Sequence, residues 1–219
     1  MGGSAVALAA EALADRCRHA VAELLSLSPD EISWQAGGVL SADGRSLSLR
    51  ELAAAVPGLE AEARFESDLV FSSGAYAADI EIERATGRLS IKRVVAVDDA
   101  GTIVNPLLAE GQVLGGTAQG LGQCLVEEMV YNDEGQPTTA SFAKYSLLTA
   151  AEMPPVETAF VESPTPLNPL GAKGIGEGGA IGTPAAVGNA VANALAGRRL
   201  DPPYTEEKLW LAIQESAER

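Results

Sequence analysis

The feature that most constrains the fold is a helix-like segment, residues 107–131, that carries five glycines. Its sequence is LLAEGQVLGGTAQGLGQCLVEEMVY. Apolar side chains recur at helical spacing along one side of this segment. They are Leu114, Ala118, Leu121, Leu125 and Met129. A glycine costs about 1 kcal/mol relative to alanine in a helix interior, so five of them need a structural or functional reason.

A second row of the same segment is polar. Gln112, Gly116, Gln119 and Gln123 lie at i, i+4, i+7 and i+11, so amide side chains flank a stretch of bare backbone. Two interpretations remain open at this point. This side of the helix could contact a polar ligand, or the small residues could let another helix pack closely while the glutamines stay exposed.

A second glycine-rich stretch, GAKGIGEGGA at residues 171–180, contains one acid, Glu177. GIGEGG satisfies G-x-G-x-x-G, but a proline-rich segment precedes it where a dinucleotide-binding fold has a strand. No GK[ST] follows the glycines, so it is not a P-loop. Exposed backbone N–H groups before a helix suit a phosphate or oxyanion, and an acid that a substrate can approach suits a general base. The alternative is a surface loop with an incidental acid.

The middle of the chain predicts a β-hairpin. Residues 76–83 alternate apolar and polar side chains, and the turn RATGR joins them to a second strand over residues 89–99. The expected apolar face of the second strand comprises Leu89, Ile91, Val95 and Val97. The acids of the first strand are expected to pair with Lys92 and with Arg93 or Arg88 on a solvated face. Phe65, Leu69 and Phe71 have the spacing of a further strand.

Four more helices are expected around this hairpin. Residues 4–27 have an amphipathic pattern, with Cys17 and Val21 on the apolar side. A short helix follows Ser48, which is a suitable N-cap, and a short C-terminal helix ends the chain. Thr183 and Pro184 are typical of the cap and first residue of a core helix over residues 185–196. The prediction is therefore an α+β fold, in which a mixed sheet with a β-hairpin packs against several helices.

Composition narrows the functional class. Fifteen basic residues against thirty acidic ones give a formal net charge of −15, which repels nucleic acids and anionic membrane surfaces. Neither is therefore an expected partner. Two isolated cysteines cannot build a disulfide framework or a thiolate metal site, so we expect a reducing, cytoplasmic location. The single histidine, His19, lies between Asp15 and Glu23 and is interpreted as a surface residue.

Two motifs together carry a family resemblance. The segment VVAVDDAGTIVNPLLAEGQVLGGTAQGLGQCLVEEMVY, followed by PLGAKGIGEGG and TPAAVGNAVANALAGRRLDPPYT, resembles the C-terminal part of a molybdenum-binding large subunit. The family is that of xanthine dehydrogenase, aldehyde oxidase and aerobic CO dehydrogenase. The order and spacing of the GQ..GG..QGLG and GxGE blocks match, clearest over residues 76–204. The resemblance extends back to Gly3.

The resemblance implies roles for five residues. Glu177, the acid of GxGE, would be the catalytic base of an oxidation that takes its oxygen from water. Gln112 would hydrogen-bond the pterin of the cofactor. Lys173, Gly174 and Gly176 would bring backbone against the cofactor beside the metal. No residue of this chain is expected to ligate the metal itself.

The same resemblance implies a cofactor and partners. The cofactor would be molybdenum–molybdopterin, in its cytosine dinucleotide form, and the substrate a small molecule: an N-heterocycle, an aldehyde or CO. Residues 1–219 would form one C-terminal molybdopterin-binding domain. Its partners would be the rest of the molybdenum subunit and iron–sulfur and FAD subunits or domains.

The chain also departs from the family, whose large subunit is several times longer. The N-terminal portion, which supplies much of the pterin site and most substrate contacts, is missing. We therefore expect the isolated chain to be incomplete and inactive and to hold no cofactor. The rival interpretation is a free-standing, non-catalytic cofactor-binding or interaction module.

Overall fold

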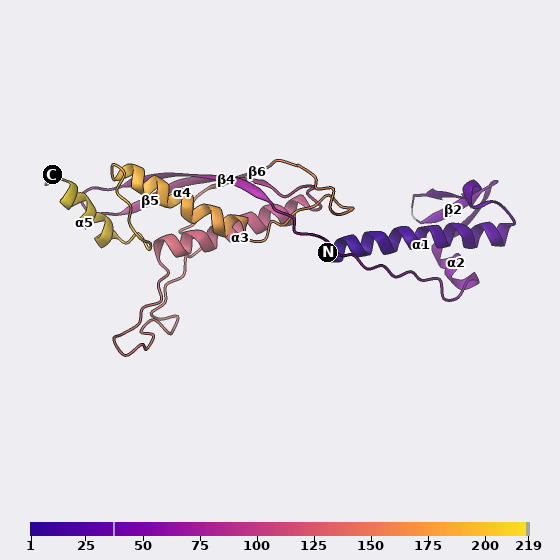
Figure 1. Ribbon diagram of the computed structural model, residues 1–219, viewed down its shortest axis with the longest axis horizontal. Helices are drawn as coiled ribbons and strands as arrows, with labels where there is room; N and C mark the ends of the chain where they lie inside the picture. The colour runs from indigo at the N-terminus through magenta and orange to yellow at the C-terminus, as the bar shows by residue number, and fades with distance from the viewer. Residues whose placement is uncertain (37, 218–219) are drawn as a thin grey trace. The chain divides into compact units, whose positions relative to one another are not determined.

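The chain combines helices with two three-stranded sheets, one of them mixed, which confirms the predicted α+β class. Residues 1–36 and 38–217 are described by the structure, which is a computed structural model (Figure 1). The chain divides into two units. Unit 1 comprises Met1–Leu69 and Pro166–Leu170, and unit 2 comprises Val70–Thr165 and Gly171–Arg219. One domain over residues 1–219 stays a prediction.

Unit 1 is a long helix with a small antiparallel sheet of order β1-β2-β3. Its elements are α1 (Gly2–Leu25), a 3-10 turn (Pro29–Glu31), β1 (Ser33–Gln35), β2 (Val39–Ala42), β3 (Arg45–Ser48) and α2 (Leu49–Ala55). Cys17 and Val21 lie in its core with Leu40 and Leu52, as the amphipathic pattern predicts. Ser48 caps α2 and accepts a hydrogen bond from the Glu51 backbone N–H at 3.3 Å, which confirms the predicted cap.

The hairpin of β2 and β3 was not predicted, although the sequence contains a signal for it. Asp43 and Gly44 form its turn with φ values of 51° and 73°. Positive φ at both central residues defines the tight turn that an Asp-Gly pair favours between antiparallel strands. An Asp-Gly pair between two short apolar runs is therefore sufficient to predict this hairpin.

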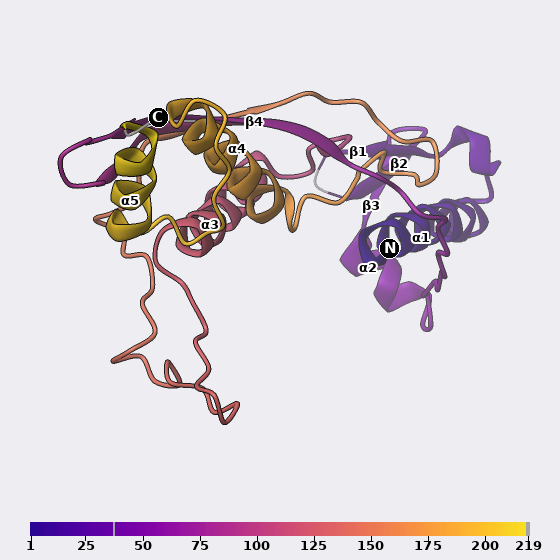
Figure 2. The ribbon, with the colours of Figure 1, turned by 60° about the vertical axis from the view of Figure 1, so that its left-hand side comes forward.

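Unit 2 has a mixed three-stranded sheet covered by helices. Its elements are β4 (Ser73–Ile82), β5 (Leu89–Asp99), α3 (Pro106–Leu125), β6 (Val156–Phe160), α4 (Gly178–Ala194) and α5 (Glu206–Ala217). β4 and β5 are antiparallel, whereas β6 pairs with β5 in parallel. Helix α4 lies between the sheet and α3 (Figures 1 and 2). Val94, Leu121, Val187 and Leu209 are fully buried in the core.

A β-bulge changes the predicted inner face of β5. The pairing register shifts between Asp79 and Ile80, which leaves Lys92 as an extra residue in β5. The inner face therefore comprises odd-numbered residues before Lys92 and even-numbered residues after it. Val94 and Ala96 are completely buried, and the predicted pair Val95 and Val97 is only half-buried. The prediction was wrong for this half of the strand, because one extra residue in a bulge reverses the faces that follow it.

The outer face of the hairpin matches the prediction. Lys92 Nζ lies 2.5 Å from a carboxylate oxygen of Glu81, and Arg93 contacts Asp79 at 3.8 Å. All four side chains are at least half exposed, so solvent screens both pairs and neither is a main source of stability. These charges belong to the solvated surface of the sheet.

The start of α4 was predicted wrongly. Thr183 and Pro184 do not begin the helix; Glu177 is its N-cap and Gly178 its first residue. Thr183 is instead fully buried, and Pro184 lies within the helix. Glycine and proline have low helix propensity. Tertiary packing overrides this propensity here, because the close contact with α3 leaves no room for a side chain.

Four of the five glycines of α3 fall into two different environments. A Cβ on Gly116 would lie 3.1 Å from Gly179 Cα, and one on Gly120 would lie 2.9 Å from Thr183 Cβ. Gly111 and Gly115 have open space instead. The close-packing interpretation therefore holds for Gly116 and Gly120, which let α3 and α4 approach each other.

Residues 59–72, all of which the structure describes, form neither a helix nor a strand. The strand predicted from Phe65, Leu69 and Phe71 is therefore absent. Leu69 and Phe71 are about four-fifths exposed, so their side chains are not buried against an apolar surface. No neighbouring strand supplies hydrogen-bond partners for the backbone of these residues.

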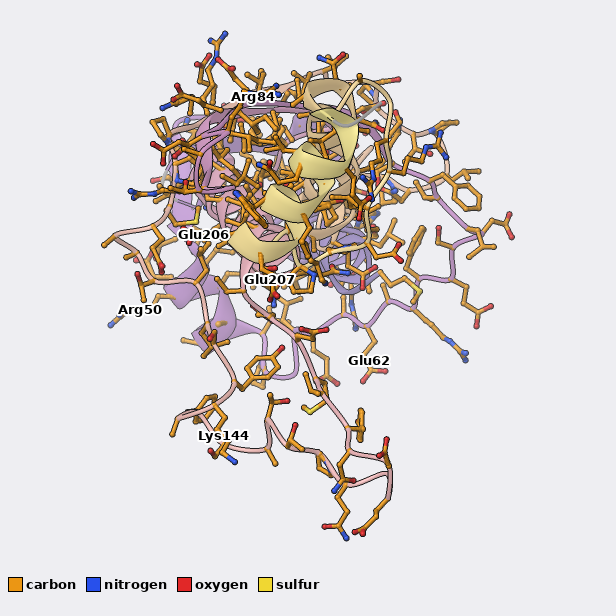
Figure 3. All side chains as sticks on the ribbon, turned by 90° about the vertical axis from the view of Figure 1, so that its left-hand side faces the viewer. Arg50, Glu62, Arg84, Lys144, Glu206 and Glu207 are labelled. Atoms are coloured by element: carbon orange, nitrogen blue, oxygen red, sulfur yellow. The ribbon has the colours of Figure 1, made fainter. Side chains whose placement is uncertain are left out.

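Surface features of unit 2 complete the fold. Residues 126–155, between α3 and β6, extend away from the helices (Figures 1 and 2). Figure 3 labels Lys144 on this segment and Glu206 and Glu207 in the first turn of α5, where the helix dipole favours acids. Across the described part of the chain, no helix is long and apolar enough to cross a membrane.

Candidate functional site

The glycine-rich stretch at residues 171–180, referred to below as the decapeptide, forms one wall of a pocket of about 440 Å³ in unit 2. The pocket lies where β4 begins, β5 ends and α4 begins. Its lining is Ser72, Ser73, Gly74, Tyr76, Asp98, Gly174, Ile175, Gly176, Glu177, Gly178, Ile181 and Gly182. Five of these residues are glycines, so much of the wall is backbone that a ligand can approach closely.

Glu177 stands at the pocket as the N-cap of α4. Its side chain is exposed and makes no capping hydrogen bond to the helix. Within the described part of the chain, no hydrogen bond or ion pair engages its carboxylate. A carboxylate that is exposed, unpaired and set among glycines can accept a proton from a molecule in the pocket.

Gln112 reaches the same loop from α3. Its side-chain Nε2 donates a hydrogen bond to the backbone carbonyl oxygen of Gly176 at 2.9 Å. This contact joins two predicted site residues that are separated by 64 positions in the sequence. One member of the predicted row of amides on α3, Gln112, therefore contacts the glycine-rich loop at Gly176, the residue before Glu177.

The Lys173 side chain forms an ion pair at the end of β5, and the predicted approach of its backbone to a cofactor stays a prediction. Its Nζ lies 2.7 Å from Asp99 Oδ2, and both side chains are 14% exposed. Its backbone N–H donates to the Ala100 carbonyl oxygen at 2.7 Å. The hydrogen bond from Lys173, followed by one from the Gly101 N–H, lowers the pKa of Asp99 below its ordinary value. The ammonium group thus anchors the loop to the end of β5.

Gly174 and Gly176 line the pocket and are exposed. A Cβ added at either glycine would meet nothing within 4 Å, so no neighbouring group among the described residues requires a glycine at these positions. Of the five predicted residues, these two and Glu177 line the pocket. Gln112 touches the loop from outside, and Lys173 lies beside the lining.

Among the lining residues that were not predicted, Tyr76 and Asp98 form a hydrogen-bonded pair. The Tyr76 hydroxyl donates to Asp98 Oδ2 at 2.7 Å, and Asp98 is only 6% exposed. Burial, followed by this hydrogen bond, raises the pKa of Tyr76 well above its ordinary value. Asp98 was missed because the sequence analysis assigned Val95 and Val97 to the inner face of β5. That assignment places the Asp98 side chain on the solvent face.

The described residues contain no group of three or more His, Cys, Asp or Glu side chains that could hold a metal ion. His19 lies in unit 1, on the exposed side of α1, and its ring Nδ1 is 2.8 Å from the Asp15 carbonyl oxygen.

Both the sequence and the fold have known relatives. Residues 1–154 match the family model described as molybdopterin cofactor-binding domain. The chain is 35% identical to the 6-hydroxypseudooxynicotine dehydrogenase complex subunit gamma of Paenarthrobacter nicotinovorans, over 98% of the chain and 29% of the relative.

Two solved structures are similar along nearly the whole chain. The crystal structure of a Cu,Mo-CO dehydrogenase matches with a TM-score of 0.86 and 28% identity, over 99% of this chain and 29% of that one. Quinoline 2-oxidoreductase from Pseudomonas putida 86 matches with a TM-score of 0.81 and 33% identity, over 94% and 28%. The chain thus spans less than a third of the length of these relatives.

Proposed function

Because the chain belongs to the molybdopterin cofactor-binding domain family, we propose that it supplies the catalytic base and part of the cofactor site of a molybdenum hydroxylase. The substrate would be an N-heterocycle, an aldehyde or CO, with water as the oxygen source. The observation that carries the proposal is the exposed, unpaired Glu177 carboxylate at a pocket walled by glycine backbone.

The residues present suit a pterin. Its ring edges carry N–H, amino and carbonyl groups, which pair with amides and backbone groups. Gly174 and Gly176 offer such backbone without side chains in front of it. Gln112 already donates to Gly176, and its side-chain oxygen can accept from the cofactor. The cofactor that we propose is the cytosine dinucleotide form of molybdenum–molybdopterin.

When bound, the cofactor supplies a metal centre that takes up two electrons from the substrate. The chain itself supplies a proton acceptor. A Glu177 carboxylate oxygen accepts the proton of the water-derived nucleophile. The oxygen of the nucleophile thereby becomes more reactive towards an electron-poor carbon. Lys173 and Gln112 hold the loop at residues 173 and 176, both of which precede Glu177.

The proposal also names the rest of the assembly. The remaining part of the molybdenum subunit would complete the cofactor site, and iron–sulfur and FAD subunits or domains would carry the electrons away. A cytoplasmic location belongs to the same proposal, since both cysteines of this chain are free and buried.

The test is Glu177→Gln in the assembled enzyme, measured as turnover per bound molybdenum. The substitution keeps the shape of the side chain and removes the proton acceptor. Turnover should fall by at least the ~10²–10⁴-fold typical of one acid–base group, while molybdenum content stays near that of the parent.

Glu110→Gln is a matched control. Glu110 is an exposed acid on α3 that does not line the pocket, so its substitution should leave turnover unchanged. Turnover of Glu177→Gln within a few-fold of the parent would remove Glu177 from catalysis and leave the chain as a cofactor-binding module. Loss of molybdenum with normal turnover of the remainder would indicate a structural role for the acid.

A further inference from the structure

Two adjacent acids end strand β5, and each contacts a different end of the Glu177 loop. Successive residues of a strand point to opposite faces of a sheet. Asp98 accordingly lies beneath the first turn of α4, and Asp99 contacts Lys173 on the other side. Both side chains are largely buried, although neither belongs to the apolar core.

The contact of Asp98 is with the start of α4. A Cβ on Gly178 would lie 3.0 Å from Asp98 Oδ1 and 3.3 Å from the Tyr76 hydroxyl. One turn later, a Cβ on Gly182 would overlap the Tyr76 ring. The first turn of α4 therefore packs directly on the hydrogen-bonded Tyr76–Asp98 pair, and Glu177 is the residue immediately before this turn.

The contact of Asp99 is with the other end of the loop. Its Oδ2 accepts from Lys173 Nζ at 2.7 Å, and its Oδ1 accepts from the backbone N–H groups of Gly101 at 2.9 Å and Ser163 at 3.2 Å. One carboxylate thus joins the end of β5, the segment after β6 and the decapeptide. A carboxylate with several donors is strongly oriented, because each hydrogen bond to a charged group is stronger than a neutral one.

We propose that Asp98 and Asp99 are positioning residues that fix both ends of the loop 173–178 and thereby hold the Glu177 carboxylate at the pocket. Lys173 lies four residues before Glu177 and Gly178 one residue after it, so little free backbone remains between the two anchors. The anchoring stands on these contacts alone. Its consequence for catalysis rests on the proposed role of Glu177 as base.

The anchoring can be measured on this chain without activity. Trypsin cleaves after lysine, and the Lys173–Gly174 bond is protected when the Lys173 side chain is paired and part-buried. Asp99→Asn keeps acceptors for Gly101 and Ser163 but removes the charge that holds Lys173. Cleavage at this bond should become at least tenfold faster, and hydrogen exchange over residues 174–181 should increase.

Glu81→Gln is the matched control, because it breaks the exposed Lys92–Glu81 pair of the same hairpin. It should leave cleavage after Lys173 unchanged. Tyr76→Phe tests the other anchor: it keeps the ring against Gly182 and removes the hydroxyl that holds Asp98. It should raise exchange in residues 178–182 while the rest of unit 2 stays protected. Unchanged exchange in both Asp99→Asn and Tyr76→Phe would overturn the proposal.

The catalytic consequence has its own measurement in the assembled enzyme. Asp99→Asn should lower kcat per bound molybdenum about tenfold or more, with KM within a few-fold of the parent, because a misplaced base slows the chemical step more than it weakens substrate binding. A loss in KM alone would contradict a positioning role. If Glu177→Gln turns over normally, the proposed function fails while the protease and exchange results still decide the anchoring.

Discussion

At the scale of single residues, the Tyr76–Asp98 pair makes the protonation of one phenol matter for stability. The Tyr76 hydroxyl donates a hydrogen bond to a buried carboxylate, so loss of its proton would leave two negative charges in contact. The folded chain therefore retains the proton to a pH higher than the ordinary tyrosine value of 10.0.

This gives a prediction for alkaline stability. Above about pH 10 the phenol of the unfolded chain loses its proton while folded Tyr76 keeps it. The unfolded state then binds fewer protons than the folded state, so the free energy of unfolding falls as the pH rises. Urea unfolding of the parent and of Tyr76→Phe between pH 8 and pH 11, a range set by that ordinary value of about 10, should show a smaller loss in the variant.

Tyr145→Phe is the comparison for that experiment. Tyr145 also donates to a carboxylate, that of Glu127 at 2.8 Å, and this hydrogen bond is the main cause that raises the pKa of Tyr145. Burial contributes more at Tyr76, so Tyr76→Phe should flatten the pH dependence more. Equal slopes in the parent and in Tyr76→Phe would show that the Tyr76 phenol is not shielded as described.

At the residue scale, the sequence names candidates where a motif contains them, and it gives no signal where local geometry decides which face a side chain occupies. Glu177 and Gln112 come from two blocks of sequence, and the structure joins them through Gly176. Asp98 could not be found in this way, because a bulge reverses the faces of β5 after Lys92. A period-two pattern carries no information about where such a bulge occurs.

At the scale of elements, close packing of α3 on α4 explains part of the glycine content. Gly120→Ala should destabilise the chain by about 1–3 kcal/mol, because its Cβ would meet Thr183 Cβ at 2.9 Å and Pro184 Cδ at 3.0 Å. Gly115→Ala, in the same helix with open space around it, should stabilise the chain by about 0.5–1 kcal/mol. Denaturant midpoints of the two variants at neutral pH measure the difference. Shifts of the same sign would contradict the packing.

The long periodic elements were predictable, and the short or tightly packed ones were not. The hairpin and α3 have patterns that extend over ten residues or more, so local errors do not change the assignment. The start of α4 depends on Gly179 lying against α3, where a Cβ would overlap the Val113 carbonyl oxygen and the backbone around it. Local signals at Thr183 and Pro184 cannot reveal a contact with residues 60 to 70 positions earlier.

At the scale of the whole molecule, the chain presents a site surface that remains open to solvent. Glu177, Gly174 and Gly176 are exposed, and Ile181 at the pocket is 69% exposed. Large apolar side chains at the start of α3 are exposed as well: Val104, Leu107 and Leu108. The relatives are more than three times as long as the matched region, and we expect their additional length to cover this surface.

The last prediction follows from this open surface. A cofactor is retained through purification when most of its polar groups are paired and its surface is enclosed, as small-molecule sites generally bury most of their ligand. The isolated chain offers one wall, with Gln112 and a few backbone groups, so it should fold, purify colourless and contain far less than one molybdenum per chain by elemental analysis. Near-stoichiometric molybdenum would contradict this and would favour a free-standing cofactor-binding module. The control is the same chain within the complete subunit, which should retain the metal, because the wall that carries Glu177 then faces the rest of the site.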